Sequence, residues 1–153
     1  VAFTAPGTTY GIPPAGSLGW ALGASLGAKL AAPDKTVICT LGDGSYIFGS
    51  GTASHIVSEA QNLPVLFIVW NNGIWNAVKS SARNMNPEGY AAKTDTWPIT
   101  TLSQSFNYEM ICQASGGYGE RVEDPAEVPA AIERALHAVK VEKRQALLNI
   151  IGA

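Results

Sequence analysis

The sequence sets an acidic residue between two glycines, in the motif Gly42-Asp43-Gly44-Ser45, directly after an apolar run. Glycine turns at the ends of strands are where α/β sheets bind ligands, and their backbone N–H groups can approach a phosphate closely. Asp43 would repel a phosphate unless a divalent cation lay between them, and Mg²⁺ takes oxygen ligands from both. The motif therefore predicts a metal-bridged phosphate site, whereas Asp43 taken alone would be expected to be a turn residue.

A second source of oxygen ligands follows the next strongly apolar run, at Asn71-Asn72-Gly73. If the strands that end at Leu41 and Trp70 are neighbours in one sheet, Asp43 and an asparagine amide oxygen meet at its carboxyl edge. Together they would supply part of the octahedral oxygen shell that Mg²⁺ prefers.

The elements that must position these residues are apolar runs of strand length that alternate with helical patterns. This alternation predicts an α/β fold in three layers, a parallel sheet with helices on both faces. Three runs are apolar or β-branched throughout, as strands buried on both faces tend to be, and a fourth is weaker. The three expected central strands are Thr36 to Leu41, Val65 to Trp70 and Ala146 to Ile151, and the weaker one is Tyr118 to Val122.

Helical patterns fill the gaps between these strands, and the last of them opens with the capping box Asp124-Pro125-Ala126-Glu127. The expected helices run from Ser17 to Ala32, from Thr101 to near Ala114 and from Asp124 to near Ala138. The segment from Lys79 to Pro98 has no clear period and contains two prolines. We expect it to be a long surface loop of the kind that often carries function.

Composition limits the classes of protein that the chain can be. Its 153 residues, 46% apolar and 14% charged, suffice for one domain with a buried core. A formal net charge of -2 without basic runs argues against nucleic acid, and no apolar run is long enough to cross a membrane. Cys39 and Cys112 show no disulfide or zinc spacing, so we expect buried free thiols in a soluble, cytoplasmic protein.

The two motifs also resemble those of a known family. Gly42-Asp43-Gly44, 26 intervening residues and Asn71-Asn72 resemble the thiamine diphosphate (ThDP) binding motif. The similarity extends upstream to Gly16-Ser17-Leu18-Gly19-Trp20 and downstream to Gly116-Gly117-Tyr118-Gly119 and Asp124-Pro125. The whole chain, residues 1–153, is therefore similar to the diphosphate-binding domain of the 2-oxo acid decarboxylase, acetolactate synthase and benzoylformate decarboxylase group, with the ThDP-binding fold.

The resemblance implies a role for each matched residue. Asp43, the Asn72 side chain and the main-chain carbonyl of Ile74 would bind Mg²⁺. Leu18 would act in catalysis by holding the thiazolium and pyrimidine rings of the cofactor in a V shape, and the Gly16 carbonyl would accept a hydrogen bond from the 4'-amino group. The full set of implied cofactor-binding residues is Gly16, Ser17, Leu18, Gly42, Gly44, Ser45, Asn72 and Ile74.

In this family a glutamate of a separate pyrimidine-binding domain activates the cofactor, and no segment here resembles that domain. The resemblance thus implies a fragment or single subunit of a larger ThDP-dependent lyase or transferase, inactive alone, that joins a pyrimidine-binding domain on another chain or on a missing segment. A small 2-oxo acid would be the substrate, and a homo-oligomer is expected. Ala77 and Ser81 replace the methionine and tryptophan typical of biosynthetic acetolactate synthases, which argues against that assignment, and Asn71-Asn72-Gly73 with Ala77 resembles benzoylformate decarboxylase-like members more closely.

Other interpretations remain beside these. The domain could be a non-catalytic binding or assembly module, or an α/β domain that binds a nucleotide through Mg²⁺. Asn71 is expected to be a turn or capping residue and His55 a structural histidine. Trp75 and Trp97 could line a substrate pocket or cover the edges of the sheet. Leu18 could be part of the core, because leucine usually is.

Overall fold

A computed structural model of the chain describes residues 5–11 and 16–152. Within them, four apolar segments form a single parallel sheet with the strand order β1-β2-β4-β3. The strands are β1 (Val37–Gly42), β2 (Val65–Asn71), β3 (Tyr118–Val122) and β4 (Ala146–Ile151). The expected α/β fold with a parallel sheet is confirmed, and each of the four expected strands is present with its ends moved by one residue at most.

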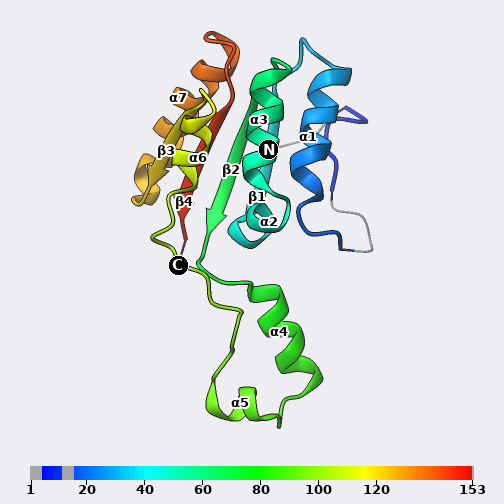
Figure 1. Cartoon of the computed structure of the whole chain (residues 1–153), viewed down its shortest axis with the longest axis vertical. Coiled ribbons are helices and arrows are strands. Elements are labelled where there is room, and N and C mark those ends of the chain that lie inside the picture. The colour runs from blue at the N-terminus through cyan, green and yellow to red at the C-terminus, as the bar shows by residue number, and fades with distance from the viewer. Residues whose placement is uncertain (1–4, 12–15, 153) are drawn as a thin grey trace.

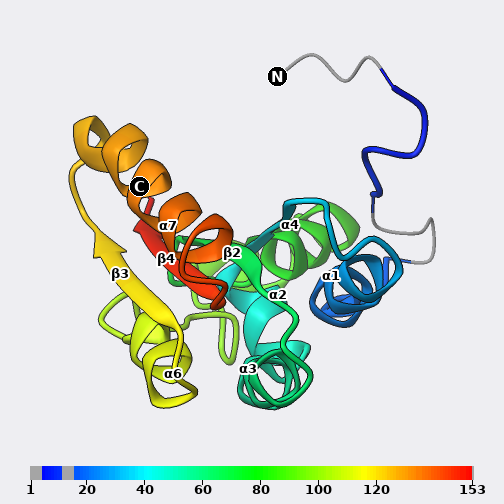
Figure 2. The same cartoon turned by 90° about the horizontal axis from the view of Figure 1, so that it is seen from above.

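Helices cover both faces of this sheet. They are α1 (Trp20–Ala31), α2 (Asp43–Phe48), α3 (Gly51–Ala60), α4 (Asn76–Met85), α5 (Tyr90–Thr94), α6 (Tyr108–Ala114), the 3₁₀ turn η1 (Pro125–Glu127) and α7 (Val128–Lys140). Figure 2 shows α7 on one face and α3 and α6 on the other. Side chains of β2 and β4 alternate between the two apolar cores that result, because successive strand residues point to opposite faces.

The strand β1 lies at an edge of the sheet, so its expected central position is wrong. Cys39 and Leu41 are buried beneath the helices of one face, whereas Ile38 on the other face is 51% exposed. The helix α7, which covers that face, packs on β4, β3 and β2. An apolar run identifies a strand, but the exposure of its second face depends on what is packed there.

Two expectations about the segment between β2 and β3 are also wrong. The range from Lys79 to Pro98 contains most of α4 and all of α5, and Figure 1 shows both helices projecting from the carboxyl end of the sheet. The helix expected from Thr101 begins at Tyr108, because Thr101 instead pairs with Ile74 in an antiparallel bridge. Helix α1 begins at Trp20, three residues later than expected.

Other local expectations agree with the structure. The Asp124 carboxylate accepts a hydrogen bond from the Ala126 N–H (2.8 Å) and caps η1, which leads directly into α7. Cys39 and Cys112 are free and buried, and burial raises their pKa values to about 11 and about 12. None of the helices in the described residues has the length and hydropathy to cross a membrane.

Candidate functional site

The two polar motifs meet at the carboxyl edge of the sheet. Strands β1 and β2 pair in parallel with Gly42 opposite Trp70, so the turns that follow them lie side by side. The chain enters α2 from one strand and the α4 segment from the other, as Figure 1 shows. The neighbouring strands that the sequence required are therefore present.

Asp43 lies between these two turns. Its side chain is 2% exposed, and its Oδ2 accepts a hydrogen bond from the Gly73 N–H at 2.9 Å. Within the described residues no cationic side chain forms an ion pair with it. Burial raises the pKa of the Asp43 carboxyl above its usual value, although N–H groups of Gly44 and Gly73 act in the opposite direction.

The two asparagines of the turn differ in burial and in the hydrogen bonds that they accept. Asn71 is fully buried, and its Oδ1 also accepts from the Gly73 N–H (3.2 Å), as expected of a turn residue. Asn72 is exposed, and its Oδ1 accepts from the Ile74 N–H (3.0 Å). Gly73 has φ +68°, and a Cβ there would press on Gln104, so this tight turn requires glycine.

A buried polar network supports the asparagine turn from below. Asn71 Nδ2 donates to Asn149 Oδ1 (3.1 Å), and Asn149 Nδ2 donates to Glu109 Oε2 (2.7 Å). Gln104 Nε2 donates to the carbonyls of Asn71 and Gly152. Sequence reasoning missed the roles of Gln104, Glu109 and Asn149. The one available signal was Asn149, a lone polar residue inside an otherwise apolar strand.

The residues at this edge fit a magnesium ion bound to a phosphorylated cofactor. A buried carboxylate is costly unless it is paired with a cation or binds a metal, and Asp43 has no cationic side chain as its partner among the described residues. Asn72 adds an amide oxygen 29 positions along the chain at the same edge, and Mg²⁺ prefers such oxygen ligands. In the described residues no cluster of three or more His, Cys, Asp or Glu side chains forms a metal site, so the remaining ligands would be carbonyl, phosphate and water oxygens.

The upstream segment reaches the same edge from α1. Gly19 packs with its backbone against Gly49, where α2 ends, and neither residue has room for a Cβ. Gly16, Ser17 and Leu18 precede this contact and are exposed, Leu18 by 38%. Leu18 is therefore not part of the described core. The segment lies beside the end of α2 that is farther from Asp43.

His55 is a structural histidine of the core. Its ring is fully buried, with Nδ1 2.6 Å from Gln145 Oε1 and Nε2 2.9 Å from the Tyr46 hydroxyl. Burial lowers the pKa of His55, and the hydrogen bond to Gln145 opposes that effect. The Gln145 amide N–H₂ donates to the carbonyls of His55 and Ser115, which fixes its orientation.

The two tryptophans of the α4 region have different neighbours. The indole of Trp75 packs directly on Gly44, where a Cβ would overlap its Cδ1 and Nε1 atoms. Trp97 instead lies against α4, with Lys79 Nζ 5.6 Å and Arg83 Cζ 5.2 Å from its ring centroid. Trp97 Nε1 donates to Asp95 (2.7 Å). Trp75 thus contacts the Gly42-Asp43-Gly44 motif. Trp97 belongs to the segment of residues 76–97 that contains α4 and α5, which we call the α4–α5 arm.

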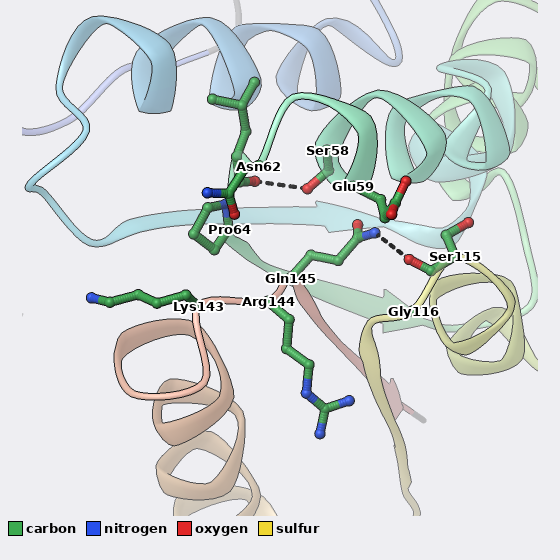
Figure 3. A pocket seen from close by; sticks show the side chains of 10 residues that line it. Ser58, Glu59, Asn62, Pro64, Ser115, Gly116, Lys143, Arg144 and Gln145 are labelled. Atoms are coloured by element: carbon green, nitrogen blue, oxygen red, sulfur yellow. Dashed lines mark hydrogen bonds between the residues drawn. The ribbon is translucent and has the colours of Figure 1, made fainter.

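A separate polar hollow opens at the opposite edge of the sheet, as Figure 3 shows. It lies where the chain enters the strands, between Pro64 before β2, Gly116 before β3 and Gln145 before β4. Its Gln145 amide is already bonded to Ser115 and His55. The hollow is therefore distinct from the edge that carries Asp43 and Asn72.

Comparisons with known proteins agree with this arrangement. A family model described as "Thiamine pyrophosphate enzyme, C-terminal TPP binding domain" matches residues 1–150; thiamine pyrophosphate (TPP) is ThDP. The chain is 35% identical over 130 residues to a probable acetolactate synthase of Mycobacterium bovis. It is 33% identical over 135 residues to 2-hydroxyacyl-CoA lyase 1 of Mus musculus. These alignments cover 85% and 88% of the chain and 22% of each relative.

A solved structure is similar as well. It is the thiamine diphosphate-dependent 4-hydroxybenzoylformate decarboxylase of Rhodococcus jostii RHA1, with a TM-score of 0.71 and 26% sequence identity. The match covers 89% of the chain and 23% of that protein. The chain thus spans less than a quarter of the length of these relatives, which include a synthase, a lyase and a decarboxylase.

Proposed function

The chain belongs to the thiamine pyrophosphate enzymes, as their C-terminal TPP-binding domain, and from this premise we propose that it binds ThDP through Mg²⁺ in a 2-oxo acid decarboxylase or carboligase. The observation that carries the proposal is the hydrogen bond from the Gly73 N–H to the buried Asp43 carboxylate. It joins the two turns of the motif and leaves a buried negative charge that has no cationic side chain as its partner in the described part of the chain.

Each residue of the site has a distinct task in this proposal. Asp43, the Asn72 amide oxygen and the Ile74 carbonyl bind the cation, which offsets the repulsion between Asp43 and the diphosphate. The diphosphate is bound by the turn residues Gly42, Gly44 and Ser45. In support, Gly42 is exposed and Ser45 is half-buried at this edge of the sheet.

The segment before α1 acts on the ring end of the cofactor. The Gly16 carbonyl accepts a hydrogen bond from the aminopyrimidine, Ser17 lines the cofactor, and Leu18 supports the bent arrangement of its two rings. The exposure of Leu18 at the same edge is consistent with this task. When bound, ThDP supplies an electron sink for breaking or forming the bond next to a carbonyl carbon.

The substrate and the partner of the complete enzyme follow from the same family. We propose a small 2-oxo acid as substrate and a pyrimidine-binding domain, which carries the activating glutamate, as partner. The relatives include both acetolactate synthases and 2-hydroxyacyl-CoA lyases. Ala77 and Ser81, which replace residues typical of biosynthetic acetolactate synthases, favour the decarboxylase alternative.

The test of this function is calorimetric titration of the chain with ThDP, with Mg²⁺ and with EDTA in its place. We expect binding only with the metal, and a loss of roughly tenfold or more in affinity for Asp43→Asn and for Asn72→Ala. Asp34→Asn and Asn84→Ala, exposed positions away from the motif, should bind as the wild type does. Equal binding with and without Mg²⁺, or no effect of either motif substitution, would contradict the proposed ligand set.

The second candidate function is a non-catalytic module that keeps the fold. Its supporting observation is that Asp43 and Glu109 are the buried carboxylates of the described residues, and Glu109 already accepts from Asn149. Cofactor absorbance in the purified complete protein separates the two, because a module without turnover needs no stoichiometric ThDP. A Mg²⁺-nucleotide domain would instead bind ADP in preference to ThDP in the same titration.

A further inference from the structure

The indole N–H of Trp75 is a buried donor without an acceptor. Its Nε1 atom is buried and has no hydrogen-bond partner in the described residues. Buried indole N–H groups usually find a partner, and a buried donor left unpaired is destabilising. By contrast, Trp70 Nε1 donates to the Thr40 hydroxyl (2.7 Å) and Trp97 Nε1 donates to Asp95 (2.7 Å).

The position of this donor shows where its acceptor would lie. A Cβ built on Gly44 would overlap Cδ1 and Nε1 of the indole, so the polar edge of Trp75 lies on the backbone directly after Asp43. Asp43 Oδ2 is already bonded to the Gly73 N–H rather than to the indole. Because the indole covers both its own Nε1 and the Gly44 backbone, a ligand can reach this donor only when the ring turns away from Gly44, which is the place of the diphosphate in the proposed function.

We propose that the Trp75 indole turns away from Gly44 when the cofactor binds and donates a hydrogen bond from Nε1 to a diphosphate oxygen. This inference rests on the proposed function. A neutral donor adds direction to phosphate binding without altering the charge balance between Asp43, Mg²⁺ and the diphosphate. It also gives Gly44 a second reason to be glycine, because any side chain there would displace the indole.

The first arm of the test measures affinity by calorimetry in the presence of Mg²⁺, with ThDP and separately with inorganic pyrophosphate. Trp75→Phe keeps an aromatic ring and removes the N–H. We expect it to weaken both ligands by about tenfold or more, since hydrogen bonds to charged groups are among the stronger ones. Trp70→Phe is the matched control, because its N–H already has a protein acceptor on the other face of the sheet, and it should bind as the wild type does.

The second arm observes binding on the wild type, and a variant serves only to assign the signal. The chain has four tryptophans, whose indole N–H signals are resolved by ¹H–¹⁵N correlation spectra, and the Trp75 signal is the one missing from Trp75→Phe or from Trp75→Tyr. Magnesium pyrophosphate should move this signal downfield. If the wild type binds ThDP with Mg²⁺, but the signal does not move and Trp75→Phe binds equally well, the role of Trp75 is refuted and the proposed function stands. If the wild type binds neither ligand, the proposed function itself fails.

Discussion

His55 is a titratable residue that the fold keeps neutral. The Gln145 Oε1 atom can only accept, so His55 Nδ1 carries the proton and Nε2 accepts from the Tyr46 hydroxyl. A second proton on the ring would break the latter bond and place a charge in the core. The lowered pKa of His55 follows chiefly from this burial.

This arrangement predicts how stability depends on pH. Below its ordinary pKa of 6.5, His55 binds a proton more readily in the unfolded chain than in the folded one, so protonation favours unfolding. The contribution of the neutral His55 ring to the free energy of unfolding should be fully present above about pH 6.5. The free energy of unfolding should fall as the pH decreases below that value. Urea titrations at pH 8, 7, 6 and 5.5 measure it. The decrease in the free energy of unfolding should persist in His137→Gln and should be absent from His55→Gln. A wild-type free energy that does not change with pH would show that His55 is not its cause.

For single residues, the sequence predicted which side chains lie at the site better than it predicted their contacts. Asp43 and Asn72 could be placed at one edge because each follows a strand and the strands are neighbours. The bond from Gly73 to Asp43 could not be predicted, because it depends on the register of β1 against β2. The contact of Trp75 with Gly44 depends in the same way on how the chain leaves its turn.

Among the elements, β4 connects the core to the site through a single polar residue. Asn149 bonds both Asn71 and Glu109, so Asn149→Leu would leave the Glu109 carboxylate without its side-chain donor, whereas Asn71 would keep its bonds to Gln104 and Gly73. We expect a loss of roughly 1–3 kcal/mol in the free energy of unfolding for the unpaired Glu109 carboxylate. Because Asn71 holds the turn that presents Asn72, affinity for ThDP with Mg²⁺ should also fall, by roughly tenfold or more.

The control for this prediction is the preceding residue of the same strand. Leu148 faces the opposite core, and Leu148→Ala should cost roughly 2–5 kcal/mol by leaving a cavity. Its cofactor affinity, measured where the variant is folded, should be that of the wild type. Equal affinity losses in both variants would mean that general stability, and not the polar network, sets cofactor binding.

The α4–α5 arm shows why some elements escape prediction. None of the α4 residues is buried, and Val78, Ala82 and Met85, which have helical spacing, belong to neither of the described cores. The helix is instead tied to the following segment by Lys79 and Arg83, one turn apart, which both face Trp97 and Asp95. The Trp97 indole and the charge of Lys79 lower the pKa of the Asp95 carboxyl.

Removing this tie should loosen the arm alone. We expect Trp97→Ala to speed backbone amide exchange across α4 and α5, because the ring that lies against Lys79 and Arg83 and donates to Asp95 is lost. Exchange in β2 and β4 should not change, since their cores contain no residue of the arm. Hydrogen exchange followed by mass spectrometry measures both regions in one experiment. Uniformly faster exchange would show that the arm supports the whole fold.

Over the whole molecule, the acidic residues determine how much of a ThDP site the chain can form. The buried carboxylates among the described residues are Asp43 and Glu109. Asp43 serves the metal in our proposal, and Glu109 accepts from Asn149 beneath the asparagine turn. Both carboxylates therefore have other roles and neither is available to protonate the pyrimidine ring of the cofactor. We expect the activating glutamate of the proposed reaction to come from a pyrimidine-binding domain.

The last prediction is that these 153 residues alone bind ThDP but do not turn over 2-oxo acids. General acid–base steps typically contribute about 10²- to 10⁴-fold to a rate, and the chain lacks a carboxylate for this one among its described residues. Apolar side chains near the carboxyl edge, such as Phe48 (68% exposed) and Leu18, would remain in water in a monomer. Large exposed apolar patches mark partner surfaces, so we expect the chain to form homo-oligomers.

Decarboxylation of pyruvate and of benzoylformate should be measured with the chain alone and with a longer polypeptide that includes a pyrimidine-binding domain. Light scattering on the same samples gives the oligomeric state. Activity is expected only with the longer polypeptide, in a dimer or tetramer whose pyrimidine domains cover Leu18 and the Asn72 turn. Rapid turnover by a monomer of the 153 residues would mean that a carboxylate of this chain activates the cofactor, and it would refute both the shared site and the oligomer.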